Sequence, residues 1–219
     1  MDANILEVFD PSDVSLYQFE PVGNEIIRDG LLSSLEGQLL KPTKFLLVEG
    51  LEGSGKSTLL YQFVQKNKRE CIALFIDSQD LNQFSEENLL KDLLIQVSCL
   101  LHEPIQYDQI EFTDSLLNSR FQTLQYELNR SGERIFVVID GMEALVESNS
   151  TLIERLLGAL PVTSRKISYL FSDEQERILS FLPASKAKQI TVPDLSSSEA
   201  SEMLPDLGKN DINALLEVF

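Results

Sequence analysis

Apolar residues along the chain form short continuous runs that alternate with longer segments in which they recur every three or four positions. Continuous runs are typical of strands buried on both faces, and the wider spacing is typical of helices with one apolar side. The predicted strands cover residues 44–50, 70–77, 134–140, 166–172 and 188–194. The predicted helices cover residues 23–39, 56–67, 85–101, 114–131, 150–160 and 173–182.

This alternation predicts an α/β fold: a five-stranded, mainly parallel sheet with helices on both faces, which is a three-layer architecture. Ligands of such folds bind at the carboxyl ends of the strands. Local signals support the boundaries, because Ser85 can cap the helix that follows it and Pro161 stops the helix before it. Residues 134–140, RIFVVID, form the clearest strand, since β-branched and aromatic side chains follow one another without a break.

The length of 219 residues suits one sizeable domain with the start of a second. We interpret residues 1–20 as an acidic lead, residues 21–195 as the main domain and residues 196–219 as the start of a helical subdomain. The chain stops inside the amphipathic segment NALLEVF, so we expect it to be a fragment of a longer protein.

Composition narrows the possible partners. Eighteen basic and 35 acidic residues give a net charge of −17, which disfavours direct binding to nucleic acid or to an anionic membrane. Two cysteines without CxxC spacing and a single histidine support neither a structural zinc site nor a disulfide framework. No apolar run approaches the ~18 residues needed to span a bilayer, and we expect a cytoplasmic protein.

The segment GLEGSGKST, residues 50–58, follows the first predicted strand and opens the next helix. Gly50, Gly55, Lys56 and Ser57 satisfy the phosphate-loop pattern GxxxxGK[ST]. Glycines let main-chain N–H groups turn towards a phosphate, and the helix dipole favours negative charge there. The alternative is a plain glycine-rich turn. The predicted nucleotide-binding residues are Gly50, Leu51, Glu52, Gly53, Ser54, Gly55, Lys56, Ser57 and Thr58.

A phosphate-bound Mg²⁺ needs a second anchor at the end of a neighbouring strand, and Asp140 ends the strand IFVVID. We predict that Ser57 and Asp140 ligate the metal and that Lys56 neutralises the phosphates. Glu143, three residues further on, is the candidate for orienting or deprotonating an attacking water. The predicted catalytic residues are therefore Lys56, Asp140 and Glu143.

With these motifs, the segments GLEGSGKSTLL, FVVIDGMEAL and TVPDLSSSEASEML resemble the signal-transducing STAND NTPases, especially the NACHT-like group. The resemblance spans roughly residues 20–205. It implies that ATP or ADP binds between this domain and adjoining helices, and that exchange or slow hydrolysis switches a larger protein between a closed monomer and an active oligomer. It also implies that the strand after the Asp140 strand lies beside the phosphate-loop strand.

Several positions depart from the NACHT-like pattern. Asn24 stands where relatives carry an arginine near the adenine, and Ala144 stands where many carry a second acid. The fourth strand ends in FSDE instead of Thr-Ser-Arg, so that Ser172 substitutes weakly for a γ-phosphate sensor. Arg165 precedes that strand and is expected on the surface. These differences predict slow hydrolysis with binding largely retained.

Three other readings are weighed. The serious alternative is a nucleotide-binding scaffold with vestigial hydrolysis. A small-molecule kinase is less favoured, because the later arginines, Arg155, Arg165 and Arg177, are scattered among acids instead of forming a lid. An initiator-type AAA+ protein would need a basic surface, which the net charge argues against. No NKxD-like guanine-reading segment is present, which by family resemblance favours adenine.

Overall fold

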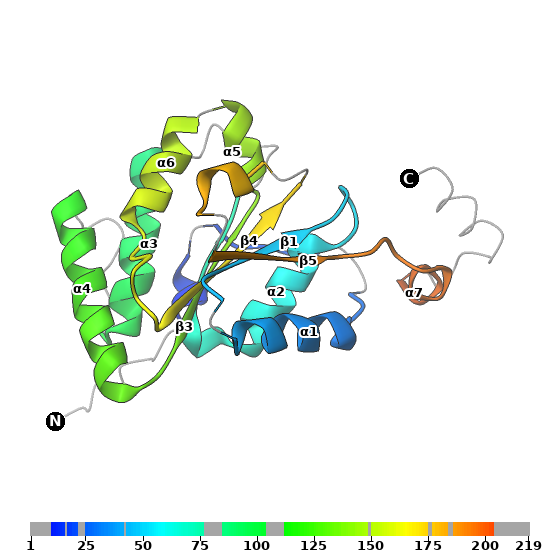
Figure 1. Cartoon of the computed structure of the whole chain (residues 1–219), viewed down its shortest axis with the longest axis horizontal. Helices are drawn as coiled ribbons and strands as arrows, with labels where there is room; N and C mark the ends of the chain where they lie inside the picture. The colour runs from blue at the N-terminus through cyan, green and yellow to red at the C-terminus, as the bar shows by residue number, and fades with distance from the viewer. Residues whose placement is uncertain are drawn as a thin grey trace, which may run out of the picture.

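The computed structural model describes residues 10–15, 17–21, 25–41, 43–76, 85–103, 112–148, 150–174, 177–183 and 186–203. Its centre is a five-stranded sheet, drawn in Figure 1, in which every strand pairing is parallel. The strands are β1 (Phe45–Glu49), β2 (Cys71–Phe75), β3 (Ile135–Asp140), β4 (Ile167–Asp173) and β5 (Ala187–Thr191). Their order across the sheet is β2-β3-β4-β1-β5, which confirms the predicted fold class and the position of β4 beside β1.

Helices cover both faces of the sheet and complete three layers (Figure 1). On one face α1 (Asp29–Leu39) and α2 (Lys56–Lys66) pack against a core that contains Leu46, Val48 and Val138. On the other face α3 (Glu86–Leu100), α4 (Asp114–Ser131), α5 (Met142–Ser148) and α6 (Ser150–Ala159) bury the larger core. Central strands have no solvent face, which explains their unbroken apolar runs.

The two edge strands are treated differently. The outer strand β5 is largely exposed, in keeping with its more polar sequence AKQIT. The β2 edge is covered: the Gln96 side chain both accepts from the main-chain N–H of Ala73 and donates to its carbonyl, each at 2.8 Å. Buried Asp92 accepts from Gln96 and from Ser15, which fixes the segment around the 3-10 helix η1 (Pro11–Val14) over this edge. Edge strands are commonly protected in this way.

Most predicted elements are present, with shifted ends. Ser85 caps α3 by accepting from Asn88 N, as predicted, and α6 ends before Pro161. The strand predicted at 188–194 occupies 187–191 instead. Asp77, at the end of the second predicted strand, and residues 204–219 lie outside the described part of the chain.

Two helix predictions are corrected. The first helix, predicted from residue 23, begins at Asp29, because residues 25–28 are not helical and Gln62 of α2 donates to Ile26 O. The helix predicted over 173–182 is wrong: Asp173 ends β4 and accepts from Ile178 N. Capping by the Asp side chain competes with helical hydrogen bonding. Within residues 177–183 only the 3-10 helix η5 (Leu179–Phe181) forms. The short helix α5 was not predicted.

None of the described helices is both long and apolar enough to cross a membrane.

Candidate functional site: a phosphate loop facing two carboxylates

The loop between β1 and α2 has the backbone that its glycines predict. Gly53 and Gly55 adopt φ angles of 78° and 93°, a region that side-chain-bearing residues rarely occupy. Gly50 is required for space, since a Cβ there would lie 2.4 Å from Ser54 Oγ and 2.9 Å from Val192 O. Gly55 is the N-cap of α2, so the unpaired N–H groups of that 11-residue helix point into the loop. The backbone is therefore shaped to receive an anion.

Lys56 opens α2 and is buried, with 8% of its surface exposed. Its ammonium donates to Gly50 O at 2.8 Å and to Leu51 O at 3.0 Å, so it lies across the loop. The side chains of Leu51 and Glu52 point to solvent. Of the predicted loop residues, these two contribute only their main chains.

Asp140, at the carboxyl end of β3, lies against this loop. The hydroxyls of Ser57 and Ser172 and the Lys56 ammonium lie close enough to its carboxylate to favour the ionised form. Burial raises the pKa of Asp140, and these neighbouring groups oppose the rise. A buried carboxylate in this position is stabilised by further positive charge.

Glu143 lies in the first turn of α5 and faces the same place. Its Oε2 accepts from Ser172 Oγ at 3.2 Å, and burial, together with the charge of Asp140, raises its pKa. The turn before it needs glycine, because Gly141 has a φ of 77° and a Cβ there would lie 2.1 Å from Ile76 O. This close approach aims α5, and hence Glu143, at the site.

Ser172, fully buried at the end of β4, connects the two carboxylates. It accepts from Gly141 N at 2.8 Å and lies within hydrogen-bond reach of both Asp140 and Glu143. A hydroxyl has one hydrogen, so Ser172 donates to one carboxylate at a time. The sequence suggested this residue only as a weak substitute; its central position follows from β4 lying between β3 and β1.

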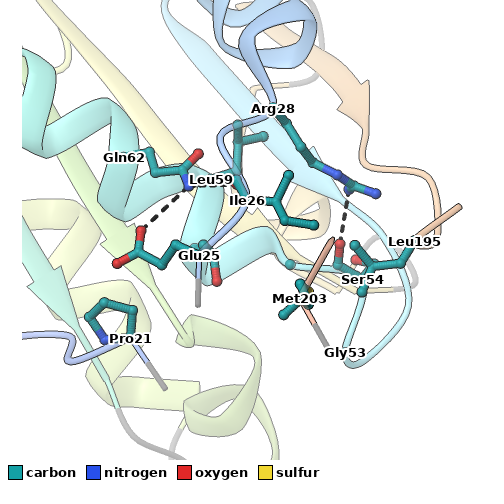
Figure 2. Close-up of a pocket in the computed structure, with 12 residues that line it drawn as sticks. Pro21, Glu25, Ile26, Arg28, Gly53, Ser54, Leu59, Gln62, Leu195 and Met203 are labelled. Carbon is teal, nitrogen blue, oxygen red and sulfur yellow. Dashed lines mark hydrogen bonds between the residues drawn. The ribbon is translucent and has the colours of Figure 1, made fainter. Parts of the chain in front are cut away.

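A cavity of about 110 Å³ opens beside the loop (Figure 2). One wall is formed by Thr58, Leu59 and Gln62 of α2, and another by the segment that includes Glu25. Leu195 and Met203 close a third side, and both come from the carboxyl-terminal part of the described chain. Gln62 donates to Ile26 O at 2.8 Å and to Glu25 Oε2 at 3.4 Å.

The cavity thus combines apolar surface with acceptor oxygens next to a phosphate loop, a mixture that suits a nucleobase and its sugar. Sequence reasoning named none of Glu25, Gln62, Leu195 and Met203 as site residues, although Leu195 and Met203 belong to the segment TVPDLSSSEASEML. Asn24 lies outside the described residues, and the Ala144 side chain is not described. Arg165 is exposed, as predicted.

The residues present fit a magnesium nucleotide. Gly50 has no room for a side chain, Gly53 and Gly55 have positive φ angles, and Ser57 and Asp140 offer the hydroxyl and carboxylate oxygens that Mg²⁺ prefers. Within the described ranges there is no group of three or more His, Cys, Asp or Glu that could hold a metal alone. A metal at this site would therefore depend on phosphate oxygens to complete its coordination.

Comparison with known families agrees with this geometry. The sequence profile of the family described as Nephrocystin 3, N-terminal matches residues 32–172, which include the phosphate loop, Asp140 and Ser172. The chain belongs to this family. No curated protein sequence matches the chain.

Solved structures share the fold of this family member. The Walker-type ATPase paby2304 of Pyrococcus abyssi superposes with a TM-score of 0.59 and 18% identity over 91% of this chain and 66% of that one. The ORC2 protein of Aeropyrum pernix, solved as ADPNP and ADP complexes, superposes with a TM-score of 0.54 and 17% identity. The match covers 89% of this chain and 54% of that one. Drosophila ORC bound to DNA superposes with a TM-score of 0.54 and 15% identity, over 86% of this chain and 52% of that one.

At these identities the likeness shows a P-loop NTPase fold. The chain spans between about half and two thirds of the length of these solved structures.

Proposed function

We propose that the chain is an ATP-binding, slowly hydrolysing module of NACHT-like type, whose nucleotide state controls the conformation and oligomerisation of a larger protein. One observation carries the proposal: Lys56 and Ser57 from the start of α2, Asp140 from β3, Glu143 from α5 and Ser172 from β4 lie together at one end of the sheet. These groups come from four elements of the fold. Structural needs alone do not explain a buried and a half-buried carboxylate that both lie next to one buried hydroxyl.

Each residue has a distinct role in this proposal. The loop N–H groups and the Lys56 ammonium bind and orient the phosphates, and Ser57 and Asp140 hold Mg²⁺. Bound magnesium nucleotide supplies the phosphoryl bond and the positive charge that keeps Asp140 ionised. Glu143, whose pKa is raised by burial, accepts the proton of an attacking water, and Ser172 orients its carboxylate.

Slow turnover is supported by what replaces the usual arginine after Ser172. Asp173 is fully buried and its Oδ1 accepts from Ile178 N at 3.0 Å, so this side chain shapes the following loop and brings no positive charge to the phosphates. A cation at that point would stabilise charge developing in the transition state. The same feature favours the second candidate function, a binding scaffold with vestigial hydrolysis.

Adenine is the proposed base, and ATP and ADP are the proposed ligands. The cavity beside the loop is closed by Leu195 and Met203, so a base in it would contact the connection after β5 and the helix Ser197–Met203. This contact supports communication between nucleotide and oligomerisation, whether through self-association or a partner protein. The net charge of −17 remains an argument against direct DNA contact, although one structural relative was solved on DNA.

The deciding experiment is to denature the purified protein and identify any released nucleotide by mass spectrometry, and then to measure phosphate release with saturating ATP and Mg²⁺. Adenine nucleotide with slow release supports the regulatory ATPase. Tightly bound nucleotide with no release at any Mg²⁺ concentration supports the scaffold. Failure to bind any nucleotide, also in a titration with a fluorescent ATP analogue, would refute both.

A further inference from the structure

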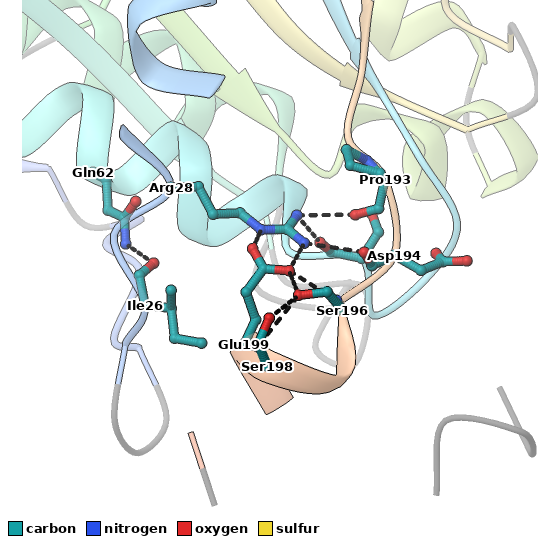
Figure 3. A network of polar contacts seen from close by, with 9 residues as sticks. Ile26, Arg28, Gln62, Pro193, Asp194, Ser196, Ser198 and Glu199 are labelled. Atoms are coloured by element: carbon teal, nitrogen blue, oxygen red, sulfur yellow. Dashed lines mark hydrogen bonds and ion pairs between the residues drawn. The ribbon is translucent and has the colours of Figure 1, made fainter. Parts of the chain in front are cut away.

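The Arg28 side chain joins three segments that are distant in the sequence (Figure 3). Its Nε and one Nη2 hydrogen reach the two oxygens of Glu199 at 2.9 and 3.3 Å. Nη1 donates to Ser54 O at 3.1 Å and to Pro193 O at 2.9 Å, and Nη2 also donates to Asp194 O at 3.2 Å. Five hydrogen bonds account for all five N–H groups of the guanidinium.

The bonds from Arg28 to Glu199 and to Ser54 are partly buried, and those to Pro193 and Asp194 are exposed. The Arg28 side chain is 9% exposed and that of Glu199 is 28% exposed. The hydrogen bond from Arg28, with those from Ser196, lowers the pKa of Glu199 from its ordinary 4.5 to about 2. A two-point Arg–carboxylate pair with low exposure is stronger and more directional than a surface ion pair.

One end of this network is the phosphate loop. Ser54 stands between Gly53 and Gly55, both at positive φ, so its carbonyl belongs to the segment that would enclose a phosphate. Because Arg28 bonds to that carbonyl and also to Pro193 and Asp194, the loop and the strand-to-helix connection after β5 are held in register by one side chain.

The other end is α7 (Ser197–Met203). Glu199 accepts from both the main-chain N–H and the hydroxyl of Ser196, at 2.8 and 2.7 Å, while Ser196 Oγ accepts from Glu199 N at 3.3 Å. This reciprocal cap fixes the start of the helix. The same carboxylate therefore holds the helix start together and ties it to Arg28. At the far end of α7, Met203 lines the cavity beside the phosphate loop.

Arg28 also lines that cavity, yet it has no N–H left for a ligand unless it releases a protein acceptor. We propose that Arg28 and Glu199 form a latch that couples nucleotide exchange to movement of α7. With the latch closed, Leu195 and Met203 wall the cavity and retain the nucleotide. With it open, α7 leaves and the nucleotide exchanges. The proposal rests on the proposed function and names the pair of residues through which the nucleotide site would be regulated.

The test uses Arg28→Lys and Glu199→Gln with matched controls Arg165→Lys, at an exposed arginine, and Glu202→Gln, at an exposed glutamate on α7. The dissociation rate of a fluorescent ATP analogue is measured by chasing with unlabelled ATP. Hydrogen exchange of residues 197–203 is followed with and without nucleotide. We expect roughly tenfold faster dissociation and faster exchange in both latch variants, as for the loss of a charged hydrogen-bond pair. The controls should match the wild type.

The double variant Arg28→Lys with Glu199→Gln decides whether the two residues act as one device. A latch predicts a rate close to that of either single variant, because the second change removes an interaction already lost. The latch would be overturned if the two substitutions multiplied each other's effect on the dissociation rate, or if the folded variants released the analogue at the wild-type rate. Either result would leave the proposed function standing. If Arg28→Lys does not fold, Glu199→Gln still tests the latch, because dissociation at the wild-type rate in that variant would overturn it. A wild type that binds no nucleotide would overturn both proposals.

Discussion

Two lysines lie at opposite ends of the sheet in similar surroundings, and only one belongs to a site. Lys44, just before β1, donates to the carbonyls of Ser164 and Ile167 and lies 4.7 Å from the centre of the Tyr169 ring. Lys56, just after the loop that follows β1, also donates to two carbonyls.

The two lysines differ in the charged groups that lie near them. Asp140 and Glu143 are close enough to interact with the charge of Lys56, whereas Lys44 meets repulsion from Lys186. Parallel strands place their carboxyl ends, and hence their loops and terminal acids, on one edge of the sheet. Lys44, which is half-buried and bonded to carbonyls, is thus a structural feature at one end of the strands. Lys56, with similar bonds, is part of a candidate binding site at the other end, where acids and a glycine loop converge.

The largest expected effect comes from removing each lysine in turn. Lys56→Ala should weaken binding of a fluorescent ATP analogue roughly hundredfold, since charge-assisted hydrogen bonds contribute about 1.5–3 kcal/mol each. Lys44→Ala should leave the affinity unchanged and lower the denaturation midpoint. Titration with the fluorescent ATP analogue measures the affinity of both variants, and urea unfolding measures their stability. Equal loss of affinity in the two would remove the distinction between the edges.

An effect of similar size, but selective for turnover, is expected from Glu143→Gln. The variant keeps the size of the side chain and its contact with Ser172 but cannot accept a proton. ATP affinity should stay near that of the wild type, while phosphate release falls about 10²-fold or more if Glu143 is the general base. Single-turnover phosphate release measures this, with the exposed Glu133→Gln as the control. Unchanged release would take Glu143 out of the mechanism and favour the scaffold.

The last expected effect is a pH dependence of the free energy of unfolding, and it comes from Lys44. Burial, with repulsion from Lys186, lowers the pKa of Lys44 from 10.5 to about 8. Between these values the unfolded chain binds more protons, so this group makes the free energy of unfolding rise as pH increases from about 8 to 10.5. Lys44→Met should lack that contribution.

Urea unfolding of the wild type and Lys44→Met across this pH range isolates the lysine, because other groups titrate in both proteins. These include Cys71, whose thiol pKa is raised by burial. If the free energy of unfolding changed with pH in the same way in both proteins, protonation of Lys44 would not be coupled to folding.

The sequence by itself determined the fold class, the phosphate loop and the acids at 140 and 143, because these depend on local rules. Strands buried on both faces must be apolar throughout. Loop residues with positive φ angles are usually glycine, and the N-terminus of a helix binds phosphate. The same local rules misplaced the helix at 173–182, where one buried aspartate captures Ile178 N and outweighs a pattern that reads as helical.

Only the tertiary structure decided which distant residues meet. Strand order inserts β4 between β1 and β3 and so puts Ser172 between two carboxylates. Chain folding brings Arg28 to Glu199, 171 residues away. Neither contact leaves a periodic or motif signal in the sequence. A hydrogen bond depends on the positions of two atoms in space, and sequence spacing fixes such positions only within a helix turn or along a strand.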